Sequence, residues 1–215
     1  GVQVTSSSKV RRENGRPVRR PHGDAEGLAA SPGGPYFISF EEDHRVSRYE
    51  ALDAPAEQVS YWEGWRAMSS NGGLEALAID PGGGLWAVAE TTGCNADATL
   101  VYTWSSGSGW QQPYVLPVTK GISPVGADFG PDGRLYVLER AVYPYGFLSR
   151  VRVFTLSPSG LADAETVLET KLGRHDNLEG ISVWVDEQGH TRLTMISDDN
   201  FLPVQRTQIV EYILR

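Results

Sequence analysis

A hairpin pattern recurs four times along the chain, at intervals of about 50 residues. Each copy has a short apolar strand, a turn that contains glycine, and a second strand rich in Val, Leu, Ile and aromatic residues. The copies are EGLAASPGGPYFISFE (26–41), EALAIDPGGGLWAVAE (75–90), GADFGPDGRLYVLER (126–140) and EGISVWVDEQGHTRLTMISDD (179–199). A hairpin that returns at this spacing restricts the chain to a β architecture built from repeated units.

Further strands are expected after each hairpin. The first three hairpins are each followed by two segments with strand character, and the fourth is followed by one. These segments span residues 45–50 and 57–63, 99–104 and 110–118, 149–156 and 164–172, and 207–214. Four antiparallel strands per unit are typical of a β-propeller blade, and no long window has helical periodicity. We therefore predict an all-β fold: one β-propeller domain over residues 1–215, with about four blades visible, at 24–63, 74–118, 125–172 and 177–214.

The N-terminal region, residues 1–20, contains a spare strand and a basic run. Residues 2–10 (VQVTSSSKV) have strand character. They either close a four-bladed ring by completing the last blade, or form the outer strand of a preceding blade in a larger ring. Residues 9–20 hold six basic residues and one acidic residue. Lys and Arg on an edge strand discourage edge-to-edge pairing, and we favour this interpretation over a docking patch.

Composition excludes several classes of protein. The formal net charge of −8 and the isoelectric point near 5.0 argue against a nucleic-acid binder. No apolar run approaches the roughly 18–20 residues that span a bilayer, so we expect no membrane span. The single cysteine, Cys94, excludes an intrachain disulfide framework and any metal site built from several cysteines.

Acidic residues recur at the same place in the hairpins. If each hairpin is regular, carboxylates face each other in pairs at the end opposite the turn: Glu26 with Glu41, Glu75 with Glu90, and Glu179 with Asp199. Directly opposed like charges destabilise a strand pair, so another group must offset the repulsion. The sheets of a propeller surround a central channel. We expect Glu26, Glu75 and Glu179 to converge there, because each begins the first strand of its blade.

This convergence predicts a metal site. Clustered carboxylates with few nitrogen or sulfur ligands suit a hard cation such as Ca²⁺, which takes about 6–8 oxygen ligands. We predict that the ligands are Glu26, Glu75, Glu179, Asp198 and Asp199. Further oxygens lie nearby in sequence on Asp24, Asn71, Asn177 and Asn200. In the alternative interpretation the acids are structural, and they cap backbone N–H groups or pair with Lys120, Arg140 or Arg174.

Two other residues are candidates for catalysis. In the third copy Val125 stands where the others have the first glutamate, and Glu139 is followed by Arg140. Arg140 either holds a substrate anion or is the counter-ion of the glutamates. His175, in GRHDNLEG, either acts as a general base or phosphate contact or is a solvated loop residue. His22, in PHGDAEG, has the analogous place before the first hairpin.

Several segments resemble the phytase-like family of bacterial propellers, also described by an esterase-like activity of phytase. They are DAEGLA (24–29), NGGLEALA (71–78), PDGRLYVLER (131–140), HDNLEGISV (175–183) and ISDDNFLPVQRTQIVEYIL (196–214). The resemblance extends from about residue 20, and its most specific part is SDDNF with the closing strand. It implies a six-bladed type of ring, of which this chain would be a part, and a periplasmic or secreted location. It also implies hydrolysis of phosphate or other esters.

Residues and resemblance together favour a Ca²⁺-dependent hydrolase of a small anionic or ester substrate. The Glu-bound cation would polarise the ester and activate water, Arg140 would hold the anion, and His175 would move protons. One alternative is a non-catalytic exported propeller that binds a ligand or protein partner and has a structural cation. A second alternative is a lactonase similar to the gluconolactonase-like propellers. The fold alone does not decide among these functions.

Overall fold

A computed structural model describes residues 3–19, 23–41, 43–68, 73–90, 97–157 and 160–214. These residues contain β-strands and one short 3₁₀ helix, η1 (Glu63–Ala67). No helix among them has the length and apolar character that a bilayer crossing requires. The strands are β1 (Ala25–Ala30), β2 (Tyr36–Phe40), β3 (Arg45–Tyr49), β4 (Glu57–Gln58), β5 (Leu74–Ile79), β6 (Leu85–Ala89), β7 (Ala98–Ser105), β8 (Gly109–Pro117), β9 (Ser123–Phe129), β10 (Leu135–Tyr143), β11 (Gly146–Ser157), β12 (Gly160–Glu169), β13 (Leu178–Val185), β14 (Thr191–Ser197) and β15 (Ile209–Ile213).

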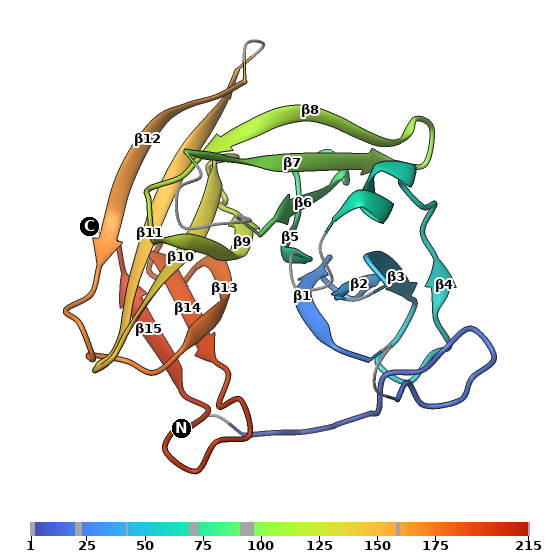
Figure 1. Cartoon of the computed structure of the whole chain (residues 1–215), viewed down its shortest axis with the longest axis horizontal. Coiled ribbons are helices and arrows are strands. Elements are labelled where there is room, and N and C mark those ends of the chain that lie inside the picture. Colours follow the sequence, from blue (N-terminus) through green and yellow to red (C-terminus); the bar gives the residue numbers. More distant parts are fainter. Residues whose placement is uncertain are drawn as a thin grey trace.

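The strands form four antiparallel sheets, arranged as consecutive blades (Figure 1). Blades 1, 2 and 3 are β1–β4, β5–β8 and β9–β12, and each has its four strands in chain order. Blade 4 is the three-stranded sheet β13–β15. The first strands of successive blades contact one another, β1 with β5, β5 with β9 and β9 with β13, so these strands are the inner ones. The predicted all-β propeller is confirmed.

Aspartate and glycine fix the turns of the last three hairpins. One carboxylate oxygen accepts backbone N–H groups within the turn: Asp80 from Gly82 and Gly84, Asp132 from Arg134, and Asp186 from Gln188 and His190. Each turn also contains a glycine at positive φ, namely Gly83, Gly133 and Gly189. Residues with a Cβ rarely adopt this backbone conformation. The turns are thus specified locally, as the sequence predicted.

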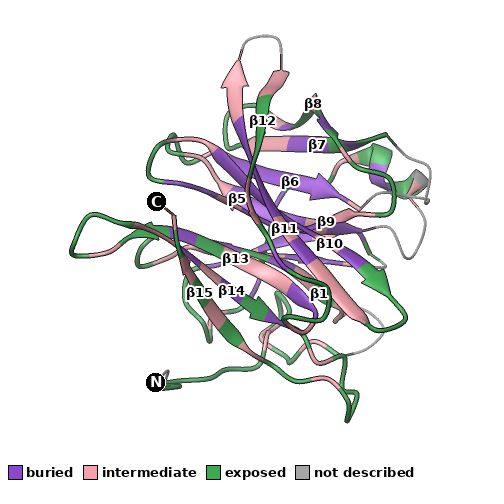
Figure 2. Cartoon of the chain, turned by 90° about the vertical axis from the view of Figure 1, so that its left-hand side faces the viewer, coloured by how far each residue is buried: buried purple, intermediate pink, exposed green. Residues whose placement is uncertain are grey.

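Buried apolar side chains lie between adjacent blades. In Figure 2 the buried residues lie along strands such as β6 and β10. Three core clusters join blade 1 to blade 2, blade 2 to blade 3, and blade 3 to blade 4. Their largest fully buried side chains include Trp65 and Leu77 in the first, Leu135 and Phe154 in the second, and Leu138, Leu178 and Leu193 in the third. Because every blade packs on its neighbour, the cores hold the inner strands at fixed positions around the channel.

The outer part of blade 1 differs from the predicted strand over residues 57–63. Strand β4 is only Glu57–Gln58, and η1 follows it. The helix carries Trp65, which is fully buried in the core between blades 1 and 2. Its ring lies edge-on to Trp110 and Tyr102, at centroid distances of 4.9 and 5.6 Å. The strand therefore ends five residues before the predicted end, and the chain buries a large indole instead.

The N-terminal residues also differ from the prediction. Residues 3–10 form no strand, and the described part of blade 4 has three strands, so no ring-closing strand is found there. The N-terminal segment instead runs past the ring to blade 1 (Figure 1). There it makes a short turn with one isolated bridge between Arg11 and Pro17, and the Tyr49 hydroxyl donates a hydrogen bond to Arg11 O at 3.1 Å. Polar serines and Pro17 do not favour a longer ladder.

Candidate metal centre

The inner strand of every blade carries a β-bulge near its start. The strand register shifts at the same place in the hairpins of blades 1 to 4. The bulged positions are Glu26, Glu75, Val125 and Glu179. The regular hairpins assumed from the sequence are therefore wrong, because the first-strand glutamates do not directly oppose their expected partners. A bulge also changes where its side chain points.

Blade 2 shows the effect of the bulge. Leu74 and Leu77 both pack between blades 1 and 2, whereas Ala76 and Ala78 pack between blades 2 and 3. In a regular strand, side chains alternate, so residues three apart would face opposite sides of the sheet. The extra residue, Glu75, belongs to neither core cluster. The bulge therefore lets the apolar residues on both sides reach their cores while the carboxylate stays out of them.

The second strand of each hairpin ends at a matched position. Backbone hydrogen bonds run from Glu41 N to Asp24 O, from Glu90 N to Gly73 O and from Asp198 N to Asn177 O, and Arg140 pairs with Ser123 in blade 3. Asp198 is therefore the blade 4 equivalent of Glu41 and Glu90, and regular pairing had wrongly put Asp199 there. Arg140 replaces the acid in blade 3.

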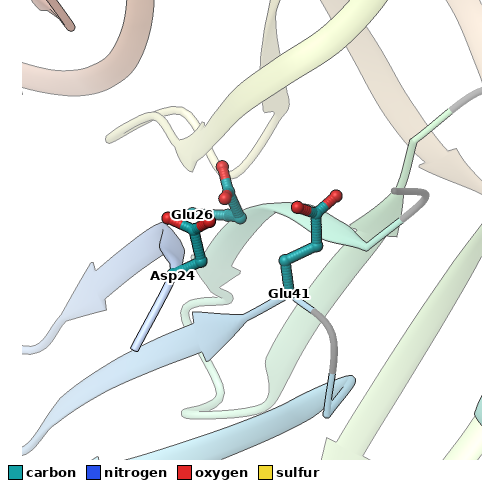
Figure 3. Close-up of side chains that lie close together, drawn as sticks. All are labelled: Asp24, Glu26 and Glu41. Carbon is teal, nitrogen blue, oxygen red and sulfur yellow. The ribbon is translucent and has the colours of Figure 1, made fainter. Parts of the chain in front are cut away.

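Five carboxylates from blades 1 and 2 come together. Asp24, Glu26 and Glu41 form one group, and Glu41, Glu75 and Glu90 form another. Within each group, one oxygen of each residue lies within 4.8 Å of the others. Figure 3 shows the first group, with the carboxylates of Asp24 and Glu26 close together and that of Glu41 beside them. We call these five residues the acidic cluster.

Burial and mutual repulsion both act on the cluster. Burial, followed by the charges of Glu41, Asp24 and Glu179, raises the pKa of Glu26 from 4.5 to about 7. Burial, followed by the charges of Glu26, Glu90 and Glu41, raises the pKa of Glu75 from 4.5 to about 8. Both shifts mean that the ionised cluster is costly without a compensating positive charge.

The charge of Arg140 acts on Glu75, Glu90 and Glu179. Its Nη1 donates hydrogen bonds to Glu179 Oε1 and, at 2.5 Å, to Asn177 Oδ1. Asn177 Nδ2 also donates to Glu179 Oε1, at 2.8 Å. Burial raises the pKa of Glu179, and Arg140 opposes this shift. Burial also raises the pKa of Glu75 and Glu90, and Arg140 opposes those shifts as well. In this structure Arg140 is thus a counter-ion, as the second interpretation predicted.

The donor set fits a hard divalent cation. Among the described residues, both groups consist only of carboxylates, and Ca²⁺ and Mg²⁺ prefer such oxygens. The acids also lie on two strands of each of two blades, which is the arrangement a cation could bridge. Three of the predicted ligands are linked electrostatically: the charge of Glu179 raises the pKa of Glu26, and that of Glu26 raises the pKa of Glu75.

The other predicted site residues lie elsewhere or outside the described residues. The Asp199 carboxylate accepts hydrogen bonds from Phe201 N and Thr207 Oγ1, within its own loop. His175 Nε2 lies 2.6 Å from the Tyr212 hydroxyl. Burial, followed by the charge of Arg174, lowers the pKa of His175. His22, Asn71 and Cys94 fall outside the described residues.

Sequence reasoning left Glu41 and Glu90 out of the ligand set, although the repeated acid at the end of the second strand was the signal for them. It also grouped Glu139 with these acids. Glu139 is instead fully buried and ion-paired with Arg150 and Arg152, and Arg152 also donates to Pro117 O at 2.6 Å. The register displaces Glu139 by one residue from the position that Arg140 occupies, which turns it toward the interior.

The fold and the site define a β-propeller with an acidic cluster where the inner strands of its blades begin. The chain belongs to the phytase-like family, described as "Esterase-like activity of phytase", whose sequence model matches residues 1–201. The match includes the N-terminal residues, which the sequence resemblance had omitted. Of the part of the resemblance that was most specific, the match includes SDDNF (197–201) and ends before the closing strand. No protein of curated function matches the chain.

Three solved structures are similar to this chain, and the first of them supports the fold. An endo-arabinase from Bacteroides thetaiotaomicron is 10% identical with a TM-score of 0.54, and the match covers 96% of this chain and 78% of that one. A putative gluconolactonase is 16% identical with a TM-score of 0.49, over 92% and 77%. A protein of unknown function from Bacteroides caccae is 10% identical with a TM-score of 0.45, over 90% and 62%. The chain thus spans less than two thirds of the length of the last protein.

Proposed function

We propose that this chain is part of a Ca²⁺-dependent hydrolase of phosphate or other esters. The single observation that carries the proposal is the acidic cluster, in which carboxylates from two blades lie within 4.8 Å of one another. Membership of the phytase-like family supports ester chemistry. Export to the periplasm or medium is part of the proposal and rests on the same family.

The residues of the cluster would have distinct tasks. Asp24, Glu26 and Glu41 would hold the cation from blade 1, and Glu75 and Glu90 would hold it from blade 2. A bound Ca²⁺ supplies Lewis acidity for the ester oxygen and for water.

Arg140 stands beside this cluster. Both of its hydrogen bonds use Nη1, and Nη2 has no partner among the described residues. Nη2 is therefore available to a substrate anion while Glu179 and Asn177 hold the guanidinium in place.

Hydrolysis assays test this proposal. The protein is incubated with p-nitrophenyl phosphate, p-nitrophenyl acetate and a gluconolactone, each with EDTA and with Ca²⁺. We expect Ca²⁺-dependent cleavage of at least one ester and a loss of about 10²-fold or more in Glu75→Gln. Glu57→Gln is the matched control, because Glu57 is exposed on outer strand β4. Cleavage that is equal with EDTA and Ca²⁺, or equally weakened in both variants, would contradict the proposal.

A purely structural cation is the second candidate. The observation that favours it is Glu41, which belongs to both carboxylate groups and so connects blade 1 to blade 2. A cation there would fasten the two blades together. In that case Ca²⁺ raises the melting temperature, none of the esters is cleaved with or without EDTA, and Glu75→Gln abolishes the stabilisation. Cleavage of only the lactone would instead point to a lactonase.

A further inference from the structure

A pocket lies between blades 3 and 4. It has a volume of about 390 Å³, at the small end of the range for ligand sites. One wall is the β10–β11 hairpin, with Tyr143, Tyr145 and Phe147, and the opposite walls include Arg174, His175 and Arg206. We call these six residues the outer pocket. None of them belongs to the acidic cluster.

Backbone contacts fix the walls of the outer pocket. Gly173 N donates to Phe147 O at 2.9 Å, which ties the loop before blade 4 to the blade 3 hairpin. A Cβ on Gly146 would lie 3.2 Å from Gly173 Cα, so the two segments are in close contact. Arg206 N donates to Asp176 Oδ2 at 3.0 Å, which holds the third segment. A pocket with tied walls binds a ligand without first having to order itself.

The charge of the outer pocket is positive. Arg174 and Arg206 are exposed, and among the described residues neither has an ion-pair partner. Asp176 also lines the pocket, but its two oxygens already accept the backbone N–H groups of Asn177 and Arg206. Burial, followed by the charge of Arg174, lowers the pKa of His175, which precedes Asp176 in the same wall. Two unpaired guanidinium groups against one satisfied carboxylate favour an anionic ligand.

Exposed aromatic and apolar surface surrounds this charge. Tyr145 is 89% exposed, Val204 87% and Tyr143 47%, and all three line the outer pocket. Large apolar side chains gathered around a hollow mark a binding site more often than isolated ones do. Tyrosine rings offer a flat face for another ring, and a pocket of this size accommodates one ring and its substituent.

We propose that the outer pocket binds an aryl anion, a single aromatic ring that carries a phosphate or a carboxylate. The ring stacks on Tyr143 or Tyr145, and the anion pairs with Arg174 and Arg206. The site does not depend on a cation in the acidic cluster. The pocket is connected to Arg140 through Asn177, because Asp176 Oδ1 accepts the N–H of Asn177 and the Asn177 side chain accepts a hydrogen bond from Arg140.

Direct binding measurements test the proposal. Titration calorimetry is done with EDTA throughout, using p-nitrophenyl phosphate, p-nitrobenzoate, inorganic phosphate and neutral p-nitrobenzyl alcohol as probes. We expect at least one of the two aryl anions to bind more than tenfold more tightly than phosphate or the neutral alcohol. Comparing p-nitrophenyl phosphate with p-nitrobenzoate shows which acid group is preferred.

Variants locate the site. Arg174→Gln and Arg206→Gln should each weaken the binding of the aryl anion about tenfold. This is the usual effect of one hydrogen bond to a charged group. Tyr145→Ala should weaken it about threefold to tenfold through lost stacking. Arg66→Gln, on exposed η1, is the control and should have no effect. Equal binding by wild type and both arginine variants, equal loss in Arg66→Gln, or equal affinity for the neutral alcohol would overturn the proposal.

The same data separate this site from the acidic cluster. If EDTA-sensitive hydrolysis is found but no aryl anion binds with EDTA present, the outer pocket proposal fails and the metal proposal stands. If an aryl anion binds and the arginine variants weaken its binding, but Ca²⁺ has no effect on hydrolysis or stability, the outer pocket proposal stands and the metal proposal fails. Unchanged melting temperatures in the variants exclude unfolding as the cause of lost binding. An arginine variant that melts early is replaced by the Met substitution at the same position, which keeps a long side chain and removes the charge.

Discussion

Replacing Glu75 with glutamine should leave the stability of the metal-free protein unchanged at low pH and raise it at high pH. Burial and three neighbouring acids raise the pKa of Glu75 from 4.5 to about 8. The folded state therefore prefers the protonated carboxyl. A group with a raised folded pKa gives its full stabilisation below its unfolded pKa, and this is lost as the pH rises through the folded pKa. Metal-free wild type should thus lose stability from about pH 5 to pH 9.

The magnitude follows from the shift. At about 1.4 kcal/mol per pKa unit, the full change from 4.5 to about 8 corresponds to roughly 5 kcal/mol. Part of this free energy comes from burial of Glu75, and part comes from repulsion between Glu75 and Glu26. We therefore expect metal-free Glu75→Gln to be about 2–3 kcal/mol more stable than wild type at pH 9, and equal within about 0.5 kcal/mol at pH 5. For a domain of this size, this is roughly 4–12 °C in melting temperature.

Thermal and urea unfolding at pH 5, 7 and 9 with EDTA measure these differences, with Glu57→Gln as the exposed control. The same series with Ca²⁺ compares how much the cation stabilises wild type and variant. At 100 times its dissociation constant, a cation stabilises wild type by about 2.7 kcal/mol, whereas the variant should gain little. A Glu75→Gln variant less stable than wild type at pH 9 in EDTA would refute the account of a strained, ionised cluster.

Three other changes test separate contacts. Arg152→Met should lower the free energy of unfolding by about 3–5 kcal/mol, because it leaves Glu139 buried with one partner fewer; a loss below about 1 kcal/mol in urea unfolding would contradict this. Gly126→Ala should destabilise by at least about 1–3 kcal/mol, since its Cβ would lie 2.4 Å from Glu179 O on the next blade, and Gly107→Ala, in open space, is the comparison. Arg140→Met should raise the pKa of Glu179 further, measurable by NMR titration, and an unchanged value would mean that the ion pair does not form in solution.

Much of the fold was predictable because its signals are local. The hairpins depend on alternating apolar residues and on aspartate and glycine at the turns, as in Asp80 with Gly83. The outer elements were less predictable. Residues 57–63 have strand character, yet burial of Trp65 against Tyr102 and Trp110 turns the end of that segment into η1.

The candidate site was only half predictable. The repeated glutamates pointed to one end of the blades, and Glu26 and Glu75 do join the acidic cluster. The pairing rule then failed, because it assumed ladders without bulges. One extra residue in each inner strand shifts every pair beyond it. In blade 4 the turn was also misplaced: Val185 pairs with Thr191, a register that would put Glu179 opposite Ser197 even without a bulge, and the acid at the matched position is Asp198.

The sequence by itself determined the order of hairpins, the positions of the turns and the recurrence of an acid beside each inner strand, since these depend on neighbours within a few residues. Only the tertiary structure decided which acids meet, that Arg140 lies among them, and that His175 faces Tyr212 in a separate pocket. The physical reason is that a repeat specifies each blade alone. Distances between side chains of different blades depend on the packed cores and on the bulges, which no single hairpin encodes.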